Sequence, residues 1–295
     1  MKPLVNTIHD TALIFEGGGM RASYTAATVK VLVENDVFFD WVGGISAGSS
    51  NTCNYVCRDP ERARRTFVDL ASDPKFGDLR TFVRGQGVFN AEYLYEQTGH
   101  PGQALPFDWD AWTANPARVR IGAFHCASGR EVYWGKDDMP TLPDLMRRVR
   151  ASSTMPGLMP TVSIDGEDYV DGALGPSGGI ALDAARADGY ERYFVVLTRP
   201  RGYRKRPPSR PGIYKALFRR YPLVAQAILD RHEGYNRTLD ELEALEEQGR
   251  AQLFFPDRMP VTNQERRVPR LQASYDAGLD QAMAELPRWL EFLRG

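Results

Sequence analysis

Two short, mainly apolar segments near the start of the chain are each followed by a glycine-containing turn and then by a segment with helical periodicity. The first segment, Thr11–Phe15, precedes three consecutive glycines and a predicted helix at Ala22–Glu34. The second, Trp41–Ile45, precedes a predicted helix at Ala47–Val56. Short apolar runs bounded by glycine are typical of buried strands. The alternation of strand and helix therefore predicts βαβ units and a parallel sheet, which is the α/β class.

The rest of the chain continues this alternation, and we expect residues 1–295 to form one domain. Asp165-Gly166 is a two-residue turn signal between two extended segments. Further strands are expected at 119–126, 131–134, 193–197 and 252–255, and further helices at 60–71, 142–152 and 180–187.

The last third of the chain contains a change in composition. Residues 199–222 are rich in Arg, Lys and Pro, which predicts a basic surface excursion that becomes helical after Gly212. C-terminal helices are expected at about 270–293, as two segments at 271–284 and 288–293. Pro287 lies between them, and proline disfavours the interior of a helix.

The composition argues against several classes of protein. The formal net charge of the 295-residue chain is −1, which gives no electrostatic basis for binding nucleic acid. Three cysteines, without a second Cys/His pair at zinc spacing, indicate neither a disulfide framework nor a metal site. No segment resembles a secretory signal or reaches the roughly 18 apolar residues of a membrane span. We therefore expect a cytoplasmic protein.

The turn after the second strand carries a candidate nucleophile. Gly44-Ile45-Ser46-Ala47-Gly48 matches G-x-S-x-G, the sharp strand-to-helix turn that presents a serine, with Gly44 and Gly48 allowing the turn to be tight. The motif is common by chance, but here it falls where a strand ends and a helix begins, as its mechanism requires.

The glycine run after the first strand suits the same chemistry. Backbone N–H groups stabilise an oxyanion where the backbone approaches closely, and the ends of neighbouring parallel strands share one edge of a sheet. Gly17, Gly18 and Gly19 are therefore candidate oxyanion-hole residues, together with Ala47 after the serine. A dinucleotide site fits less well because Ala22 replaces its third glycine, and the P-loop pattern is absent.

A serine hydroxyl needs a base to become a nucleophile. The order Ser46, Asp171, His232 matches the triad order of α/β-hydrolases. In that fold, however, several strands separate the oxyanion loop from the nucleophile, whereas here one helix does. His232 also lies in a polar segment typical of an exposed helix end. Asp171, which ends an extended segment, is the better candidate, and the triad remains the alternative.

Three motifs together resemble the patatin-like phospholipase family. They are residues 17–21 (GGGMR), residues 44–48 (GISAG) and residues 171–173 (DGA), which correspond to an oxyanion loop, a serine one helix later and an aspartate motif. Residues 151–160 (ASSTMPGLMP) are similar to the family's segment before the aspartate strand, with Thr154 and Met159 as departures. The resemblance extends from about residue 13 to residue 197.

The resemblance implies a fold, an activity and a mechanism. The implied fold is a three-layer α/β/α arrangement around a mainly parallel sheet. The implied activity is hydrolysis of lipid acyl esters by a Ser46–Asp171 dyad without histidine, metal or organic cofactor. A free aspartate has a pKa near 3.9, so direct catalysis needs a dry site or a hydrogen bond that forms with the substrate.

Several alternatives stay open at this point. The fold could serve a non-enzymatic lipid-binding or regulatory module, or acyl transfer to an acceptor other than water. Arg21 is a candidate substrate-binding residue, for a phosphate, or a solvated arginine of the first helical turn. The basic segment is either a contact with an anionic membrane surface or a solvated excursion.

Overall fold

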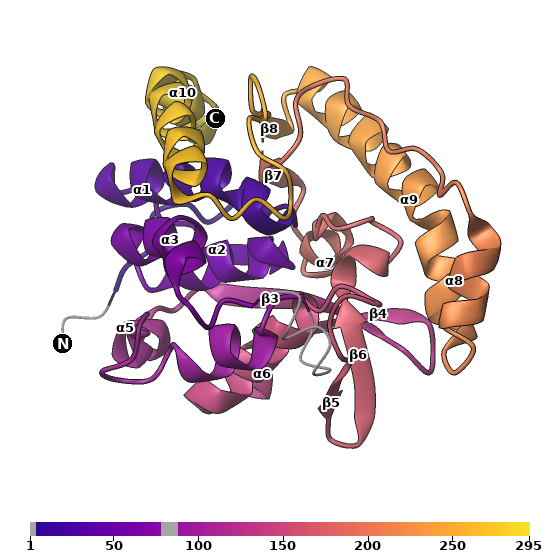
Figure 1. The fold of residues 1–295 in the computed structure, drawn as a ribbon. Coiled ribbons are helices and arrows are strands. Elements are labelled where there is room, and N and C mark those ends of the chain that lie inside the picture. The colour runs from indigo at the N-terminus through magenta and orange to yellow at the C-terminus, as the bar shows by residue number, and fades with distance from the viewer. Residues whose placement is uncertain (1–3, 78–87) are drawn as a thin grey trace.

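The structure is a computed structural model that describes residues 4–77 and 88–295 (Figure 1). Within these residues, eight strands form one sheet. The strands are β1 (Thr11–Phe15), β2 (Trp41–Ile45), β3 (Arg118–His125), β4 (Arg130–Trp134), β5 (Val162–Ile164), β6 (Glu167–Asp171), β7 (Arg192–Val196) and β8 (Ala251–Phe254). Their order is β5-β6-β3-β2-β1-β7-β8, with β4 also paired to β3. β1, β2, β3, β7 and β8 run parallel, and β4, β5 and β6 join by antiparallel pairing.

β2 and β6 lie end to end along one edge of β3. Ile45 of β2 pairs with Gly122 of β3, and Asp171 of β6 pairs with the next residue, Ala123. β4 occupies the opposite edge over the same stretch of β3. Because β2 is parallel to β3 and β6 is antiparallel to it, the C-terminal ends of β2 and β6 point at each other. The two predicted catalytic residues are placed by this junction.

Helices cover both faces of the sheet. They are α1 (Ala22–Glu34), α2 (Ala47–Val56), α3 (Pro60–Phe67), α5 (Trp109–Ala114), α6 (Leu142–Ser152), α7 (Leu182–Ala187), α8 (Pro211–Leu217), α9 (Pro222–Glu247) and α10 (Val268–Arg294). Alternate residues of β1 explain the layering, since neighbouring side chains of a strand point to opposite faces. Leu13 and Phe15 join the core with α1, α2, α3, α6 and α10, whereas Ala12 and Ile14 join the core with α7 and α9. The protein is therefore an α/β structure with a mostly parallel sheet between two helical layers, as expected.

Most element bounds agree with the sequence predictions to within two residues. β1, β2, α1, α2 and α6 have the expected limits, and the remaining predicted strands differ by one residue at their ends. The predicted helix at 60–71 is shorter: α3 ends at Phe67, and a 3-10 turn follows at Asp69–Ser72. Asp165 and Gly166 form the tight turn between β5 and β6, both with positive φ (53° and 84°).

The C-terminal segment is one helix, and the prediction of two helices was wrong. α10 runs through Pro287, which has no N–H to donate to the carbonyl one turn earlier in the helix. Pro287 is exposed, so water can hydrate that carbonyl instead. Trp289, two residues further on, is fully buried and packs edge-on against Phe194 and Phe254 of the sheet. Packing against the sheet therefore holds the helix together beyond the proline.

Residues after 220 are built into both layers. Figure 1 shows α10 (yellow) beside α1 on one side of the sheet and α9 (orange) on the other. α10 crosses α1 closely, because a Cβ on Gly278 would lie 2.2 Å from the Tyr24 carbonyl oxygen. β8 extends the sheet next to β7. The basic segment forms an irregular stretch followed by α8, as the composition predicts.

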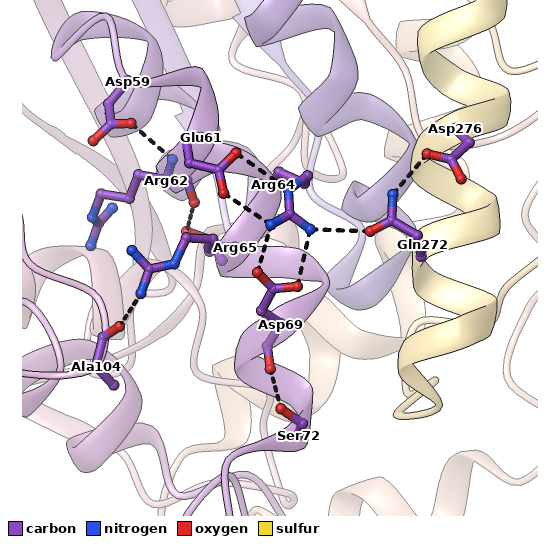
Figure 2. A network of polar contacts seen from close by, with 11 residues as sticks. Asp59, Glu61, Arg62, Arg64, Arg65, Asp69, Ser72, Ala104, Gln272 and Asp276 are labelled. Atoms are coloured by element: carbon purple, nitrogen blue, oxygen red, sulfur yellow. Dashed lines mark hydrogen bonds and ion pairs between the residues drawn. The ribbon is translucent and has the colours of Figure 1, made fainter.

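A polar network ties α3 to α10 (Figure 2). The Asp59 carboxylate accepts a hydrogen bond from the Arg62 N–H (2.8 Å) and so caps the start of α3. Arg64 pairs with Asp69 (2.8 Å) and donates to the Gln272 side chain of α10 (3.1 Å). These contacts fix the position of α3, which lines the pocket described below.

Candidate active site

Ser46 occupies the predicted strand-to-helix turn. Its backbone has φ 57° and ψ −128°, an uncommon conformation for a residue other than glycine. The turn is tight: a Cβ on Gly44 would lie 2.3 Å from the Gly48 carbonyl oxygen, and a Cβ on Gly48 would lie 2.1 Å from the Phe15 carbonyl oxygen. The motif glycines are therefore required by close backbone contacts between β1, β2 and α2.

The end of α6 holds both Ser46 and Asp171. The Ser46 N–H donates to the Ser152 hydroxyl (2.9 Å), and that hydroxyl donates to the Gly122 carbonyl (2.5 Å). The Asp171 N–H donates to the Thr154 carbonyl (2.8 Å). Residues 152–154 therefore fix the backbone of both candidate residues at the junction of β2 and β6.

Asp171 is a buried carboxyl next to Ser46. It is 6% exposed, and its Oδ1 accepts a hydrogen bond from the Ala173 N–H (2.9 Å). Burial raises the pKa of the Asp171 carboxyl, while the charge of Arg231, the Ala173 N–H and a side-chain hydrogen bond with Ser46 lower it in part. The site therefore has the dry environment that a carboxylate needs to act as a base.

The glycine loop lies directly against Ser46. A Cβ on Gly17 would be 2.9 Å from both the Ile45 carbonyl oxygen and the Ser46 Cβ. The Gly17 N–H donates to the Gly179 carbonyl (3.2 Å). Contrary to the sequence prediction, this N–H is therefore not free to stabilise an oxyanion. The function of Gly17 here is to allow close approach.

The remaining candidate donors are free in the described part of the chain. The N–H groups of Gly18 and Gly19 have no partner there. Gly19 has φ 55°, and a Cβ on it would lie 2.5 Å from the Asn263 carbonyl oxygen. Ala47 begins α2, so its N–H is one of those that a helix leaves without an internal partner. Gly18, Gly19 and Ala47 therefore remain candidate donors for an oxyanion.

Arg21 is buried, not solvated. It is 9% exposed, and burial lowers the pKa of its guanidinium to about 10, with Arg199 also lowering it and Glu16 raising it. Its Nε has no hydrogen-bond partner among the described residues.

His232 does not complete a triad. It lines the same small pocket as Asp171. However, its Nδ1 lies 2.8 Å from the Leu229 carbonyl oxygen within α9, and its Nε2 lies 3.9 Å from the Glu233 carboxylate. Neither ring nitrogen is hydrogen-bonded to Ser46 or Asp171.

An apolar pocket opens beside Ser46. Its lining includes Ser46, Ala47 and Gly19 on one side, and further residues from α3, α6 and the segments around them. The large apolar members are Phe67, Leu70, Phe76, Phe89, Met146 and Met159. Tyr95 also lines it, from a π-helical turn at Glu92–Gln97. Burial raises the pKa of the Tyr95 phenol, and the nearby charge of Asp171 adds to this effect. The pocket can accept a hydrophobic chain next to the serine.

Fold and site together define an α/β protein with a serine at a strained strand-to-helix turn, beside a buried aspartate and a glycine loop. Comparison with known families agrees: the model described as "Patatin-like phospholipase" matches residues 13–181. The chain belongs to the patatin-like phospholipase family, a family of lipid hydrolases. Residues 221–294 match a second model, described as a domain of unknown function (DUF6363).

Two individual proteins illustrate the similarity. The "Uncharacterized protein YjjU" of Escherichia coli (strain K12) is 30% identical over 191 residues, which is 64% of this chain and 52% of the relative. The chain thus spans about half the length of this relative. The crystal structure of VipD from Legionella pneumophila aligns over 93% of this chain and 67% of VipD, with a TM-score of 0.46 and 11% identity.

Several residues around the site could not be assigned a role from the sequence. Ser152 and Thr154 were noticed only as part of a family segment, because a hydrogen bond across the fold leaves no local pattern. Lys205 and Arg231 lie in the pocket beside Asp171. The richness in Arg and Lys at 199–222 was the available signal for Lys205, but it did not distinguish inward from outward side chains.

Proposed function

We propose that the protein is a lipid acyl hydrolase of the phospholipase or esterase type, with Ser46 as nucleophile and Asp171 as general base. The observation that carries the proposal is the buried Asp171 carboxyl interacting with the Ser46 hydroxyl, beside an apolar pocket. Membership of the patatin-like phospholipase family supports the class of reaction.

The reaction proceeds in two steps. Asp171 accepts the hydroxyl proton as the Ser46 oxygen attacks the acyl carbonyl, and the N–H groups of Gly18, Gly19 and Ala47 stabilise the oxyanion. The carbon–oxygen bond to the leaving alcohol breaks, and Asp171 returns the proton to that alcohol. Water then attacks the acyl-enzyme while Asp171 accepts a proton from it. The bond between the acyl carbon and the Ser46 oxygen breaks, Asp171 returns the proton to that oxygen, and the fatty acid is released.

The position of Asp171 makes this use of a carboxylate reasonable. A carboxylate is a better base at neutral pH when its pKa is raised, and burial acts in that direction here. The candidate oxyanion donors Gly18 and Gly19 lie on tightly packed backbone, and donors held in place before substrate arrives are the most effective.

The test combines labelling with turnover. The protein and its Ser46→Ala, Asp171→Asn and His232→Ala variants are incubated with a fluorescent fluorophosphonate and assayed with p-nitrophenyl esters of short and medium chains. We expect no labelling of Ser46→Ala, a loss of at least about 10²-fold in kcat/KM for Asp171→Asn, and little change for His232→Ala.

Other outcomes lead to the alternatives. An active Asp171→Asn together with an inactive His232→Ala would favour the Ser46–Asp171–His232 triad. A protein that binds lipid vesicles but neither labels nor hydrolyses any ester would be a lipid-binding or regulatory module. Appearance of an acylated acceptor in place of free fatty acid would indicate acyl transfer.

We also propose a contact with an anionic membrane surface, which the exposed side chains of α8 and the start of α9 support. Ile213, Leu217 and Leu223 are 54%, 61% and 45% exposed. The exposed cations among them are Arg210, Lys215, Arg219 and Arg220. Apolar and cationic side chains on one surface favour anionic lipid interfaces. α8 also borders the Asp171 pocket through Tyr214, so this contact would bring lipid to the site.

Vesicle co-sedimentation tests this contact. We expect the protein to bind phosphatidylglycerol vesicles more strongly than phosphatidylcholine vesicles, and the Ile213→Asn/Leu217→Asn variant to lose that binding. Met283→Asn is the matched control, because Met283 is 52% exposed on α10. Equal loss in the control would contradict the assignment to α8. Among the residues that the structure describes, no helix combines the length and apolar character needed to cross a membrane.

A further inference from the structure

A second pocket adjoins the candidate site on the side of Asp171. Asp171, Lys205, Arg206 and Arg231 line it, with Tyr214 of α8 and Ile228 of α9 among its other walls. Met155 lines both this pocket and the apolar pocket beside Ser46. The Ser46–Asp171 pair therefore lies between an apolar cavity and a basic one. A lipid ester has the same two parts, an acyl chain on one side of the scissile bond and a headgroup on the other.

Positive charge is in excess around the basic pocket. Lys205 is close enough to Arg21, Arg199 and Arg231 for each to lower the pKa of its ammonium, which burial and these charges bring to about 7. Glu16 is the acid that acts on both Arg21 and Lys205, and Asp171 interacts with Arg231 and Lys205. The Glu16 carboxylate already accepts a hydrogen bond from the Thr198 N–H (2.5 Å).

The cations of this cluster lack ion-pair partners among the described residues. Lys205 and Arg199 lie over tyrosine rings, at 4.6 Å from Tyr235 and 4.4 Å from Tyr203. Arg231 makes only long contacts with the Gly178 carbonyl (3.3 and 3.4 Å).

Arg21, nine-tenths buried behind the glycine loop, has no side-chain hydrogen bond or ion pair with any described residue. A cation withdrawn from water is normally paired, so the buried Arg21 and the half-buried Lys205, Arg199 and Arg231 together favour the binding of an anion.

Neighbouring cations of the same basic segment are paired, which makes the contrast informative. Arg201 pairs with Glu246 (2.7 Å), and Arg204 pairs with Asp240 and Glu243 (2.8 Å each). The acids of α9 thus neutralise these two arginines, whereas Lys205, the residue after Arg204, has no acid as ion-pair partner in the described part of the chain. Its backbone is held in place by Asn236 of α9, through hydrogen bonds of 2.8 and 3.0 Å.

We propose that Lys205 and Arg231, backed by Arg21 and Arg199, bind the phosphate group of a phosphoglyceride substrate on the leaving-alcohol side of the Ser46–Asp171 pair. The proposal rests on the proposed acyl-hydrolase function and specifies its substrate class. Guanidinium and ammonium groups are the side chains suited to phosphate, with charge-assisted hydrogen bonds. With the acyl chain in the apolar pocket and the phosphate in the basic one, the ester carbonyl is placed at Ser46. Arg231 belongs to the segment that matches a domain of unknown function, so that segment contributes to the substrate site.

The kinetic test compares two substrates that differ only in phosphate. Dihexanoyl phosphatidic acid and dihexanoylglycerol are hydrolysed by the unmodified protein, by Lys205→Gln/Arg231→Gln and by the control Arg294→Gln, which removes an exposed charge at the end of α10. We expect the double variant to lose about 10- to 100-fold in kcat/KM on the phospholipid, mainly through KM, and less than about threefold on the neutral glyceride. Any effect through the pKa of Asp171 is common to both substrates, so the ratio isolates the phosphate.

Two results would overturn the assignment. An equal loss on both substrates would show that Lys205 and Arg231 support the catalytic pair and do not bind phosphate. Equal inhibition of the hydrolysis of both substrates by inorganic phosphate would indicate that the pocket binds free phosphate and not the phosphate group of the substrate.

A binding measurement separates this proposal from the proposed function. The Ser46→Ala protein is titrated with dihexanoyl phosphatidylglycerol below its micelle concentration by calorimetry, with and without Lys205→Gln/Arg231→Gln. Binding that is weakened about tenfold or more by the double change would uphold the phosphate pocket even if the unmodified protein hydrolyses no ester. Unchanged binding in a double variant whose circular dichroism is normal would refute it.

Discussion

Gly17→Ala should damage the active site through contact alone. Gly17 does not have a positive φ, so alanine fits its backbone conformation. Its Cβ, however, would lie 2.9 Å from both the Ile45 carbonyl oxygen and the Ser46 Cβ. Ordinary contacts of a Cβ begin near 3.4 Å, so the loop or the serine must move by about half an ångström. Neither neighbour is the end of a flexible side chain.

The magnitude follows from this displacement. A misplacement of about 1 Å at a catalytic group can cost about 10²-fold in rate, so half of that distance predicts a loss of about tenfold in kcat/KM. Overpacking of a buried position costs about 1–3 kcal/mol of unfolding free energy. The fluorophosphonate labelling rate should fall with kcat/KM, because both report attack by Ser46.

The assay uses p-nitrophenyl butyrate turnover and urea unfolding, with Gly212→Ala as the control. A Cβ on Gly212, at the start of α8, would meet nothing within 4 Å, so that variant should keep full activity. If Gly17→Ala retained activity within a factor of two of the unmodified protein, close approach to Ser46 would not be the reason for glycine at this position.

Three further predictions concern single residues away from that contact. Burial, with the charges of Arg231, Arg21 and Arg199 and against that of Glu16, lowers the pKa of Lys205 to about 7, so Lys205 should lose its charge and the Ser46→Ala protein its affinity for phosphatidylglycerol between pH 6 and 8. Lys205→Arg should flatten this pH profile, and an unchanged slope in that variant would contradict the prediction. Pro287→Ala should raise the unfolding free energy by about 1–3 kcal/mol in urea titrations, because proline is poorly tolerated inside α10, and a lower urea midpoint would count against this explanation. Burial raises the pKa of Glu131 to about 8, so the stability that the protonated side chain contributes is complete below the pKa of Glu in the unfolded chain and is lost as the pH rises to 8. The unfolding free energy of Glu131→Gln should therefore rise relative to that of the unmodified protein between pH 5 and 8.5. Parallel profiles of unfolding free energy against pH would refute this.

The N-terminal half of the fold could be predicted from the sequence because its signals are local. Thr11–Phe15 and Trp41–Ile45 are short apolar runs bounded by glycine, and their helices follow at once, so the strand limits agree with the structure. The Asp165-Gly166 turn could be predicted for the same reason, since both of its residues tolerate positive φ.

What could not be predicted depends on contacts distant in sequence. Pro287 predicted a helix end, but the burial of Trp289 against the sheet outweighs the proline. The Gly17 N–H could not be known to be occupied, because its partner, Gly179, lies 162 residues further along the chain. Arg21 could be named as a candidate substrate-binding residue, but the cations that surround it, Arg199 and Arg231, come from distant parts of the chain.

The junction of β2 and β6 has a mechanical consequence. Ser46 follows the residue paired with Gly122, and Asp171 is paired with Ala123, so both are mounted on consecutive positions of one strand. Bending or twisting of the sheet moves such neighbours together, so the distance between the two side chains stays nearly constant. Other walls of the two pockets come from α3, α8 and α9, which are not tied to that strand. Displacement of those helices, by heating or by mutation, should therefore change the shapes of the two pockets before it changes the spacing of Ser46 and Asp171.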